Sequence, residues 1–173
     1  MDVINDLEWP GGEHLARQAL PAARAMADLK QRARMAGVPV IYVNDNFGRW
    51  RSDFRQILDR CLQPAVRGEP VARLLAPDEQ DYFILKPKNS AFYGTALDIL
   101  LTHLGARKLI IAGFATDICV LYSANDAHMR NYDVVVPSDC VAAESTAANE
   151  QALDLMRKAL DVAVMPQAEV SLG

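Results

Sequence analysis

Short apolar runs rich in β-branched residues recur along the chain, and amphipathic segments separate them. Apolar runs of this length, bounded by turn residues, predict buried strands. The five runs cover residues 38–44, 81–85, 108–114, 132–137 and 161–165. Because predicted strands alternate with helical patterns, we expect an α/β fold with a mainly parallel sheet.

The segments between these runs carry helix signals. Pro21 stands where a first helical turn would begin, and Gly37 follows as a stop. Ser145 opens the last helix, in which Ala152 and Leu153 belong to an apolar stripe. Longer helices are predicted over residues 21–35, 95–104, 117–130 and from 145 onward, and short helical patterns lie near 52–62 and 70–75.

The length of 173 residues predicts one domain over residues 1–173. We expect it to be Rossmann-like, with helices on both faces of the sheet. A doubly wound sheet has an apolar strand before its first helix, but the opening stretch MDVIND leaves almost no room for one. We therefore expect a truncated first strand, with either an unusual sheet or an imprecisely placed Asp2.

Composition and charge narrow the classes of partner. With 18 Lys and Arg against 22 Asp and Glu, the net charge is −4, and we expect no nucleic-acid partner. No segment reaches the roughly 18 apolar residues of a membrane span, so no membrane partner is expected. Cys61, Cys119 and Cys140 form no CxxC pair. This pattern favours a reduced, cytoplasmic setting over disulfides or structural zinc.

Three side chains lie where ligands bind in open parallel sheets, beyond the carboxyl ends of strands. They are Asp2, Lys86 and Cys119. Cys119 is in the first turn of a predicted helix, where unsatisfied N–H groups and the helix dipole lower a thiol pKa. The alternative is a small buried hydrophobic residue, which is how we interpret Cys61 and Cys140.

Lys86 and Asp2 also have ordinary alternatives. Lys86 would be a solvated residue at a strand edge, like Lys88 beside it, and Asp2 would be disordered at the chain terminus. As functional groups, the amine of Lys86 would support a nearby negative charge and Asp2 would act as a general base. The local sequence leaves both interpretations open.

Three motifs follow one another along the chain. They are Asp-x-x-Asn-Asp at residues 2–6, Lys-x-x-x-Ser-Ala-Phe at 86–92 and Gly-x-x-Thr-Asp-x-Cys-Val at 113–120. Together they resemble the isochorismatase-like hydrolases, the superfamily that includes nicotinamidases and N-carbamoylsarcosine amidase. The resemblance extends from Asp2 to about Met165, which is nearly the whole chain.

The resemblance implies a catalytic triad of Asp2, Lys86 and Cys119. Cys119 would attack a carbonyl, Asp2 would take the thiol proton, and Lys86 would hold both in their charged forms. The resemblance also implies an oxyanion hole made by the N–H groups of Ala115 and Cys119. One such donor contributes about 3 kcal/mol to lowering the barrier. A cis peptide bond is expected between Phe114 and Ala115.

The nicotinamidases in this superfamily bind a divalent metal through an Asp-x-His motif. The matching residues here are Asp45, Asn46 and Phe47, and no histidine lies between His14 and His103. We therefore predict no metal and no cofactor.

Residues near the expected pocket are candidates for substrate contacts. They are Asn44, Asp45, Arg49, Trp50, Arg51 and Phe92. The arginines suit a carboxylate or a planar group, although a solvated loop is the simpler interpretation.

These features favour a metal-independent cysteine hydrolase that cleaves the C–N bond of a small amide or carbamoyl compound through a thioester. One alternative is a vinyl-ether hydrolase of the isochorismatase type, although such members typically lack the cysteine. Another is a chain of the same fold that is catalytically impaired because its short N-terminus misplaces Asp2. The resemblance further implies a homo-oligomer.

Overall fold

The computed structural model describes residues 1–48, 50 and 53–172, and within them the strands form three parallel ladders. The pairs are β1 (Ile41–Asp45) with β2 (Tyr82–Lys86), β5 (Asp133–Pro137) with both β3 (Lys108–Ile110) and β7 (Ala163–Met165), and β4 (Gly113–Phe114) with β6 (Val141–Ala142). This arrangement confirms the predicted α/β class and the parallel strands.

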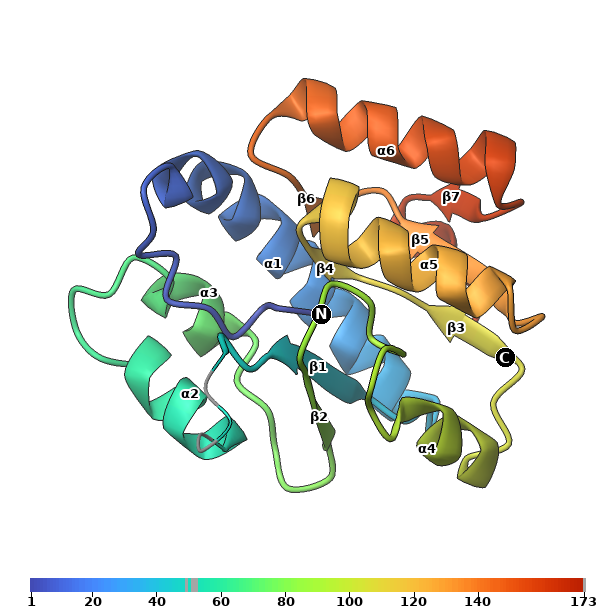
Figure 1. Ribbon diagram of the computed structural model, residues 1–173, viewed down its shortest axis with the longest axis horizontal. Helices are drawn as coiled ribbons and strands as arrows, with labels where there is room; N and C mark the ends of the chain where they lie inside the picture. The colour runs from blue at the N-terminus through green and yellow to red at the C-terminus, as the bar shows by residue number, and fades with distance from the viewer. Residues whose placement is uncertain (49, 51–52, 173) are drawn as a thin grey trace.

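Helices lie on both sides of the strands (Figure 1). They are α1 (Gly12–Met35), α2 (Phe54–Cys61), α3 (Glu69–Leu74), α4 (Leu97–His103), α5 (Leu121–His128) and α6 (Thr146–Ala159), with a π-helical turn η1 (Thr116–Val120) and a 3₁₀ turn η2 (Gln167–Glu169). The helix α1 contacts β4 and β6, whereas α5 and α6 contact β5 and β7 respectively. Among the described residues, no helix combines the length and the apolar character that crossing a membrane requires.

The first helix begins earlier than the sequence signal indicated. It starts at Gly12, and Pro21 lies inside it rather than at its start. Leu15 and Ala19 before the proline are buried on the same helix as Ala22 after it. Burial of this continuous stripe stabilises a longer helix than the local signal predicts, because tertiary packing supplies most helical stability.

The predicted strand 108–114 is divided into β3 and β4. Gly113, at φ +123°, begins β4 and its ladder, and a Cβ built there would lie 2.0 Å from the carbonyl oxygen of Met1. Only glycine combines this backbone conformation with so close a neighbour. The division therefore results from the packing of the N-terminus, which the apolar run itself does not reveal.

The first two residues connect β1 to β4. The amide of Asp2 donates to the carbonyl of Val43 at 2.8 Å, and the amide of Phe114 donates to the carbonyl of Met1 at 2.9 Å. The Met1 amino group donates to the carbonyl of Ala112 at 2.7 Å. Of the two expected outcomes, an unusual sheet is therefore the one observed, and Asp2 is firmly held.

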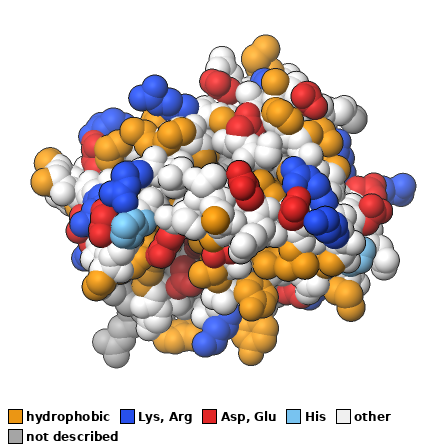
Figure 2. Space-filling model, turned by 90° about the horizontal axis from the view of Figure 1, so that it is seen from above, with side chains coloured by type: hydrophobic (Ala, Val, Ile, Leu, Met, Phe, Trp, Pro, Cys, Tyr) orange, Lys and Arg blue, Asp and Glu red, His pale blue; other side chains and the backbone are white. Residues whose placement is uncertain are grey.

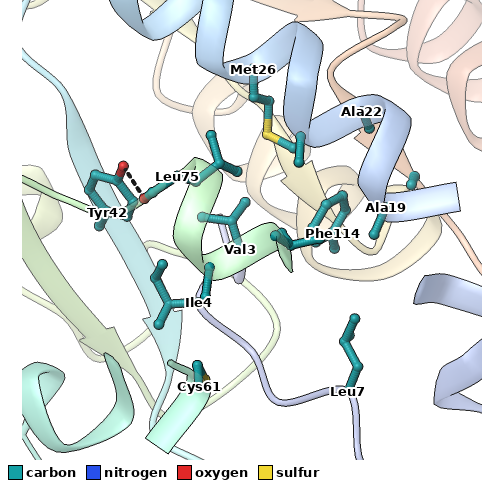
Figure 3. Packing of buried hydrophobic residues seen from close by; sticks show 14 of the residues in the cluster. Val3, Ile4, Leu7, Ala19, Ala22, Met26, Tyr42, Cys61, Leu75 and Phe114 are labelled. Carbon is teal, nitrogen blue, oxygen red and sulfur yellow. Dashed lines mark hydrogen bonds between the residues drawn. The ribbon is translucent and has the colours of Figure 1, made fainter. Parts of the chain in front are cut away.

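The residues that follow are part of the core (Figure 3). Val3, Ile4 and Leu7 are buried with Met26 of α1 and with Phe114 of β4. A second apolar cluster lies against α4, α5 and α6. Because the opening segment buries several apolar side chains, its fold is fixed by packing even though it forms no strand.

Candidate active site

Three chain segments bring Asp2, Lys86 and Cys119 together. Lys86 ends β2, Cys119 lies in η1, and Asp2 lies beside β1. The Lys86 Nζ is 3.0 Å from Asp2 Oδ2 and donates to Cys119 Sγ at 3.4 Å. Asp2 and Cys119, predicted from two separate motifs, therefore flank the ammonium group of Lys86, predicted from a third.

Lys86 is completely buried. Burial by itself lowers the pKa of its ammonium, but the negative charges of Asp2 and Cys119 outweigh that effect and raise the pKa. A buried lysine is tolerated when it is paired in this way. Lys86 is therefore a permanent positive charge in the site, and its alternative as a solvated strand-edge residue is wrong.

The pKa of the Cys119 thiol is raised to about 12. Burial is the largest cause, the negative charge of Asp2 adds to it, and Lys86 acts in the opposite direction. The expectation that the helix start would lower this pKa is therefore wrong, because desolvation of the thiolate is the dominant effect. The resting group is a protonated thiol, so attack requires a base within reach.

Asp2 is positioned to be that base. Its Oδ1 accepts from the amide of Asp45 at 2.6 Å, and its backbone is held by Val43. Its φ of 49° lies in the left-handed region, where aspartate is more common than most residues. The Lys86 ammonium pairs with Asp2 and also donates to Cys119 Sγ, so the carboxylate and the thiol adjoin the same cation.

The backbone around Cys119 has two special features. The peptide bond between Phe114 and Ala115 is cis, as the resemblance implied. In η1 the carbonyl of Ala115 accepts from the amides of Ile118 at 3.2 Å and Val120 at 3.1 Å. The amide of Cys119 lies between these two donors in the same turn.

Two of the predicted substrate-contact residues, Asn44 and Phe92, are buried in the fold. Asn44 is fully buried, and its Nδ2 donates to the carbonyl of Ile4 at 2.6 Å, so it holds the N-terminal segment. Phe92 is also buried, with the Arg130 guanidinium 4.6 Å from its ring centre. Both side chains are thus buried and have partners within the fold, and their contact with a substrate stays a prediction.

Asp45 and Trp50 remain accessible. The Oδ2 of Asp45 is 3.6 Å from the Lys86 Nζ, and its side chain is about one-third exposed. Trp50 is largely exposed. Arg49 and Arg51 lie outside the described residues. Asp45 is therefore the candidate that adjoins the triad.

Met1 is a site residue that sequence reasoning missed. Its amino group is buried, and burial lowers its pKa to about 6. Its carbonyl and amino group place the following Asp2 between two strands. Only its position next to Asp2 could have pointed to this role, because methionine carries no reactive signal of its own.

The Asp-x-His metal motif of the nicotinamidases does not fit the side chains here. Asp45 Oδ1 accepts from the amide of Phe47, Asp45 Oδ2 faces Lys86, and Phe47 supplies a phenyl ring where that motif has an imidazole. In the described part of the chain, no group of three His, Cys, Asp or Glu side chains is spaced to hold a metal ion. We derive no catalytic step through a metal.

The molecular face in Figure 2 carries acidic and basic side chains that are interspersed rather than gathered by sign. A protein that tracks a nucleic-acid backbone concentrates its basic residues on one face. The view thus contains no such basic stripe.

Comparison with known proteins shows the family to which this chain is similar. The isochorismatase domain family matches residues 1–169. YaaI of Bacillus subtilis, an uncharacterized isochorismatase family protein, is 41% identical over 170 residues, covering 98% of this chain and 93% of that protein. The structure of N-carbamoylsarcosine amidase from Thermoplasma acidophilum has a TM-score of 0.71 at 29% identity, covering 90% of this chain and 87% of that one.

A second enzyme matches over a shorter region. Ureidoacrylate amidohydrolase RutB of Acinetobacter baylyi is 35% identical over 127 residues, covering 62% of this chain and 52% of that protein. The family match extends over nearly the whole chain, and the YaaI match is long as well. The chain therefore belongs to the isochorismatase family of hydrolases.

Proposed function

We propose that this protein is a metal-independent cysteine hydrolase that cleaves the C–N bond of a small amide or carbamoyl compound. The observation that carries the proposal is the position of Lys86, whose Nζ lies 3.0 Å from Asp2 Oδ2 and 3.4 Å from Cys119 Sγ. One buried cation between a carboxylate and a thiol allows the proton to move from sulfur to oxygen while a positive charge remains beside both.

The first half-reaction forms the acyl-enzyme. Asp2 accepts the thiol proton as Cys119 Sγ bonds to the carbonyl carbon. The resulting oxyanion is stabilised by the N–H groups of Ala115 and Cys119. When the tetrahedral intermediate collapses, the C–N bond breaks, and Asp2 returns the proton to the departing nitrogen. A thioester on Cys119 remains.

The second half-reaction releases the product. Asp2 takes a proton from water, and the hydroxide oxygen bonds to the thioester carbon. The C–S bond then breaks, the acid product leaves, and the Cys119 sulfur regains its proton from Asp2. Lys86 stays protonated throughout, which is consistent with its raised pKa.

The relatives support this class of substrate. The names of N-carbamoylsarcosine amidase and ureidoacrylate amidohydrolase both describe enzymes that act on carbamoyl or ureido compounds. Such groups carry N–H donors. The partly exposed carboxylate of Asp45 beside Lys86 suits these donors, and Trp50 is the other exposed candidate. We further propose that the enzyme works in the cytoplasm as a homo-oligomer.

Two alternatives are less well supported. A vinyl-ether hydrolase does not need a nucleophilic sulfur, whereas Cys119 Sγ accepts from Lys86, which is itself paired with Asp2. A chain impaired by a misplaced Asp2 disagrees with the 2.6 Å and 2.8 Å hydrogen bonds that hold this residue.

The test is a panel of small amides, carbamoyl compounds and one vinyl ether, assayed with the wild type and with Cys119→Ala. We expect ammonia or amine release by the wild type, an acyl adduct on Cys119 in quenched mass spectra, and a loss of roughly 10³-fold or more in the variant. The matched control is Cys61→Ala, because Cys61 is buried away from the triad and should leave turnover within a few-fold.

Three results would contradict the proposal. They are full C–N hydrolysis by Cys119→Ala, cleavage of the vinyl ether alone, and loss of activity on treatment with a chelator. The last of these would disprove metal independence even if Cys119 were the nucleophile.

A further inference from the structure

The first residue of η1 is anchored to a different helix. Thr116 is fully buried, and its Oγ1 donates a hydrogen bond to Oδ1 of Asn149 in α6. The two residues are 33 positions apart in the chain. Because a buried hydroxyl that loses its partner destabilises the folded state, the fold favours keeping this hydrogen bond intact.

The pairing of β4 with β6 brings the two residues together. Phe114 in β4 lies opposite Ala142 in β6, and the two strands are parallel. The turn η1 follows the carboxyl end of β4, and α6 follows that of β6 after its cap at Ser145. Since these two ends lie at the same edge, η1 and α6 contact each other, and Figure 1 shows α6 alongside α5, which continues η1.

The turn η1 has π-helical hydrogen bonds. The carbonyl of Ala115 accepts from the amide of Val120, five residues further along. The carbonyl of Thr116 accepts in the same way from the amide of Leu121. Such turns are rare and occur frequently at functional sites. A single turn of this kind is short, so a hydrogen bond from Thr116 to another helix limits how the turn can rotate against the strands.

The position of this anchor in the chain bears on the proposed reaction. Thr116 directly follows Ala115 and precedes Cys119 by three residues. The N–H groups of Ala115 and Cys119 are the two to which we assign the oxyanion. Donors of this kind lower the barrier only when they point to where the charge develops, and a misplacement of about 1 Å can cost about 10²-fold in rate. A rotation of η1 would turn both donors away from that point.

We propose that Asn149 is a positioning residue for the hydrolysis, because its Oδ1 holds the Thr116 hydroxyl and thereby fixes the direction of the oxyanion-binding N–H groups in and before η1. This inference rests on the proposed function. A purely structural hydrogen bond would contribute to the free energy of unfolding and leave the reactions of the folded protein unchanged. A positioning bond, in contrast, is needed for those reactions of Cys119 that pass through an oxyanion.

The test compares two reactions of the same sulfur atom. With para-nitrophenyl acetate, Cys119 Sγ bonds to the carbonyl carbon while Asp2 takes the thiol proton, an oxyanion forms, and the C–O bond then breaks to release nitrophenolate, which is measured in a single turnover. Iodoacetamide alkylates the same sulfur by direct displacement of iodide, without an oxyanion. The rates of Cys119→Ala are subtracted from both measurements.

Thr116→Val removes the hydroxyl and nearly keeps the shape of the side chain. We expect its acylation to slow by about 10- to 100-fold at saturating ester, while the half-saturating concentration changes by less than about threefold and the pH profile of alkylation stays within about twofold. Thr116→Ser keeps the hydroxyl and should acylate within about threefold of the wild type. Asn149→Ala should slow acylation about tenfold, and the double variant should be no slower than Thr116→Val, because both changes remove the same bond.

The matched control is Ser145→Ala on the same helix. Ser145 Oγ accepts from the amide of Ala148 at 3.1 Å, so this change removes a hydrogen bond of α6 but not the bond to η1. It should lower the urea midpoint and leave acylation within about twofold of the wild type. If Thr116→Val does not fold, the comparison of Asn149→Ala with Ser145→Ala decides, because Asn149 is only partly buried.

Four results would overturn the positioning role while the proposed function stands. They are acylation of Thr116→Val and Asn149→Ala at the wild-type rate, alkylation slowed as much as acylation, equal slowing of acylation in Ser145→Ala, and additive effects in the double variant. Failure of the proposed function has a different signature, because the wild type itself would then form no acyl adduct on Cys119 and hydrolyse no amide. That result would overturn the positioning role as well.

Discussion

This protein has two lysine–aspartate pairs that are shielded from solvent, and the pKa values of their lysines are shifted in opposite directions. Lys30 on α1 is 2.7 Å from Asp81, and Lys86 at the end of β2 is 3.0 Å from Asp2. The pKa of Lys30 is lowered by its burial, whereas the charges of Asp2 and Cys119 raise that of Lys86. The difference lies in the partners that each ammonium and carboxylate have besides each other.

Both charged groups of the Lys30–Asp81 pair have further hydrogen-bond or ion-pair partners. Its ammonium also donates to the hydroxyl of Tyr42 at 2.7 Å and to the carbonyl of Ala76 at 3.1 Å. Asp81 accepts in addition from the amide of Asp78 and faces Arg34. Every strong donor therefore has an acceptor, and such a network is structural.

In the Lys86–Asp2 pair, by contrast, one carboxylate oxygen has no hydrogen-bond partner. Among the described residues, the buried side-chain atoms without a hydrogen-bond partner are Asp2 Oδ2 and Asn44 Oδ1, and the first of them belongs to this pair. Asp2 Oδ2 has the ion pair with Lys86, whose ammonium also donates to Cys119 Sγ. An oxygen with spare acceptor capacity beside a thiol is what a general base needs. The structural pair, Lys30–Asp81, thus has all its hydrogen-bonding groups satisfied, whereas the pair that we propose to be reactive, Lys86–Asp2, does not.

The sharpest way to test this contrast is to replace each lysine by methionine. Lys86→Met should reduce hydrolysis by roughly 10³-fold or more, because the cation between Asp2 and Cys119 is lost. Lys30→Met should cost about 3 kcal/mol of unfolding free energy, because a buried pair is broken, and should leave turnover within a few-fold at a temperature where it is folded. Urea unfolding and steady-state kinetics measure the two effects. Equal losses of activity in both variants would remove the distinction.

Replacing each aspartate by asparagine tests the base. Asp2→Asn should lower hydrolysis by about 10²–10⁴-fold, the usual contribution of a general base. Its iodoacetamide labelling of Cys119 at pH 8 should become faster, because removal of the carboxylate lowers the thiol pKa while Lys86 remains. Asp81→Asn should change neither the rate of hydrolysis nor the rate of Cys119 labelling. It should lower the free energy of unfolding instead. Slower labelling of Asp2→Asn would show that Asp2 does not hold the thiol pKa up.

A smaller effect concerns the third buried amine, that of Met1. Burial lowers its pKa from the ordinary value near 8 to about 6, so between these values the unfolded chain binds a proton that the folded chain does not. The free energy of unfolding should therefore decrease as the pH falls from 8 through 6. Urea midpoints at both pH values measure this, with an N-terminally acetylated chain as control. The decrease should be smaller after acetylation, and an identical decrease would exclude the amine as its cause.

Local sequence signals succeeded where the structure depends on neighbours in the chain. Ser145 caps α6, with its Oγ accepting from the amide of Ala148 at 3.1 Å, as a serine before an apolar stripe predicts. The apolar run at 108–114 was found as a strand, but its division at Gly113 was not, because that depends on Met1. The same holds for α1, whose start at Gly12 is determined by burial on β4 and β6.

The sequence by itself predicted which side chains carry the proposed chemistry. Asp2, Lys86 and Cys119 stand at strand and helix ends, and topology requires the ends of parallel strands to meet at one edge. Their spacing also determined the family, because three ordered motifs extend over nearly the whole chain.

Only the tertiary structure decided how those side chains behave. The Cys119 thiol has a raised pKa because burial and the charge of Asp2 outweigh both Lys86 and the position of the thiol in a first helical turn. Asp2 is held because Val43 and Asp45, far away in the chain, supply its hydrogen bonds. Desolvation and long-range pairing depend on which distant residues surround a group, and no local pattern contains that information.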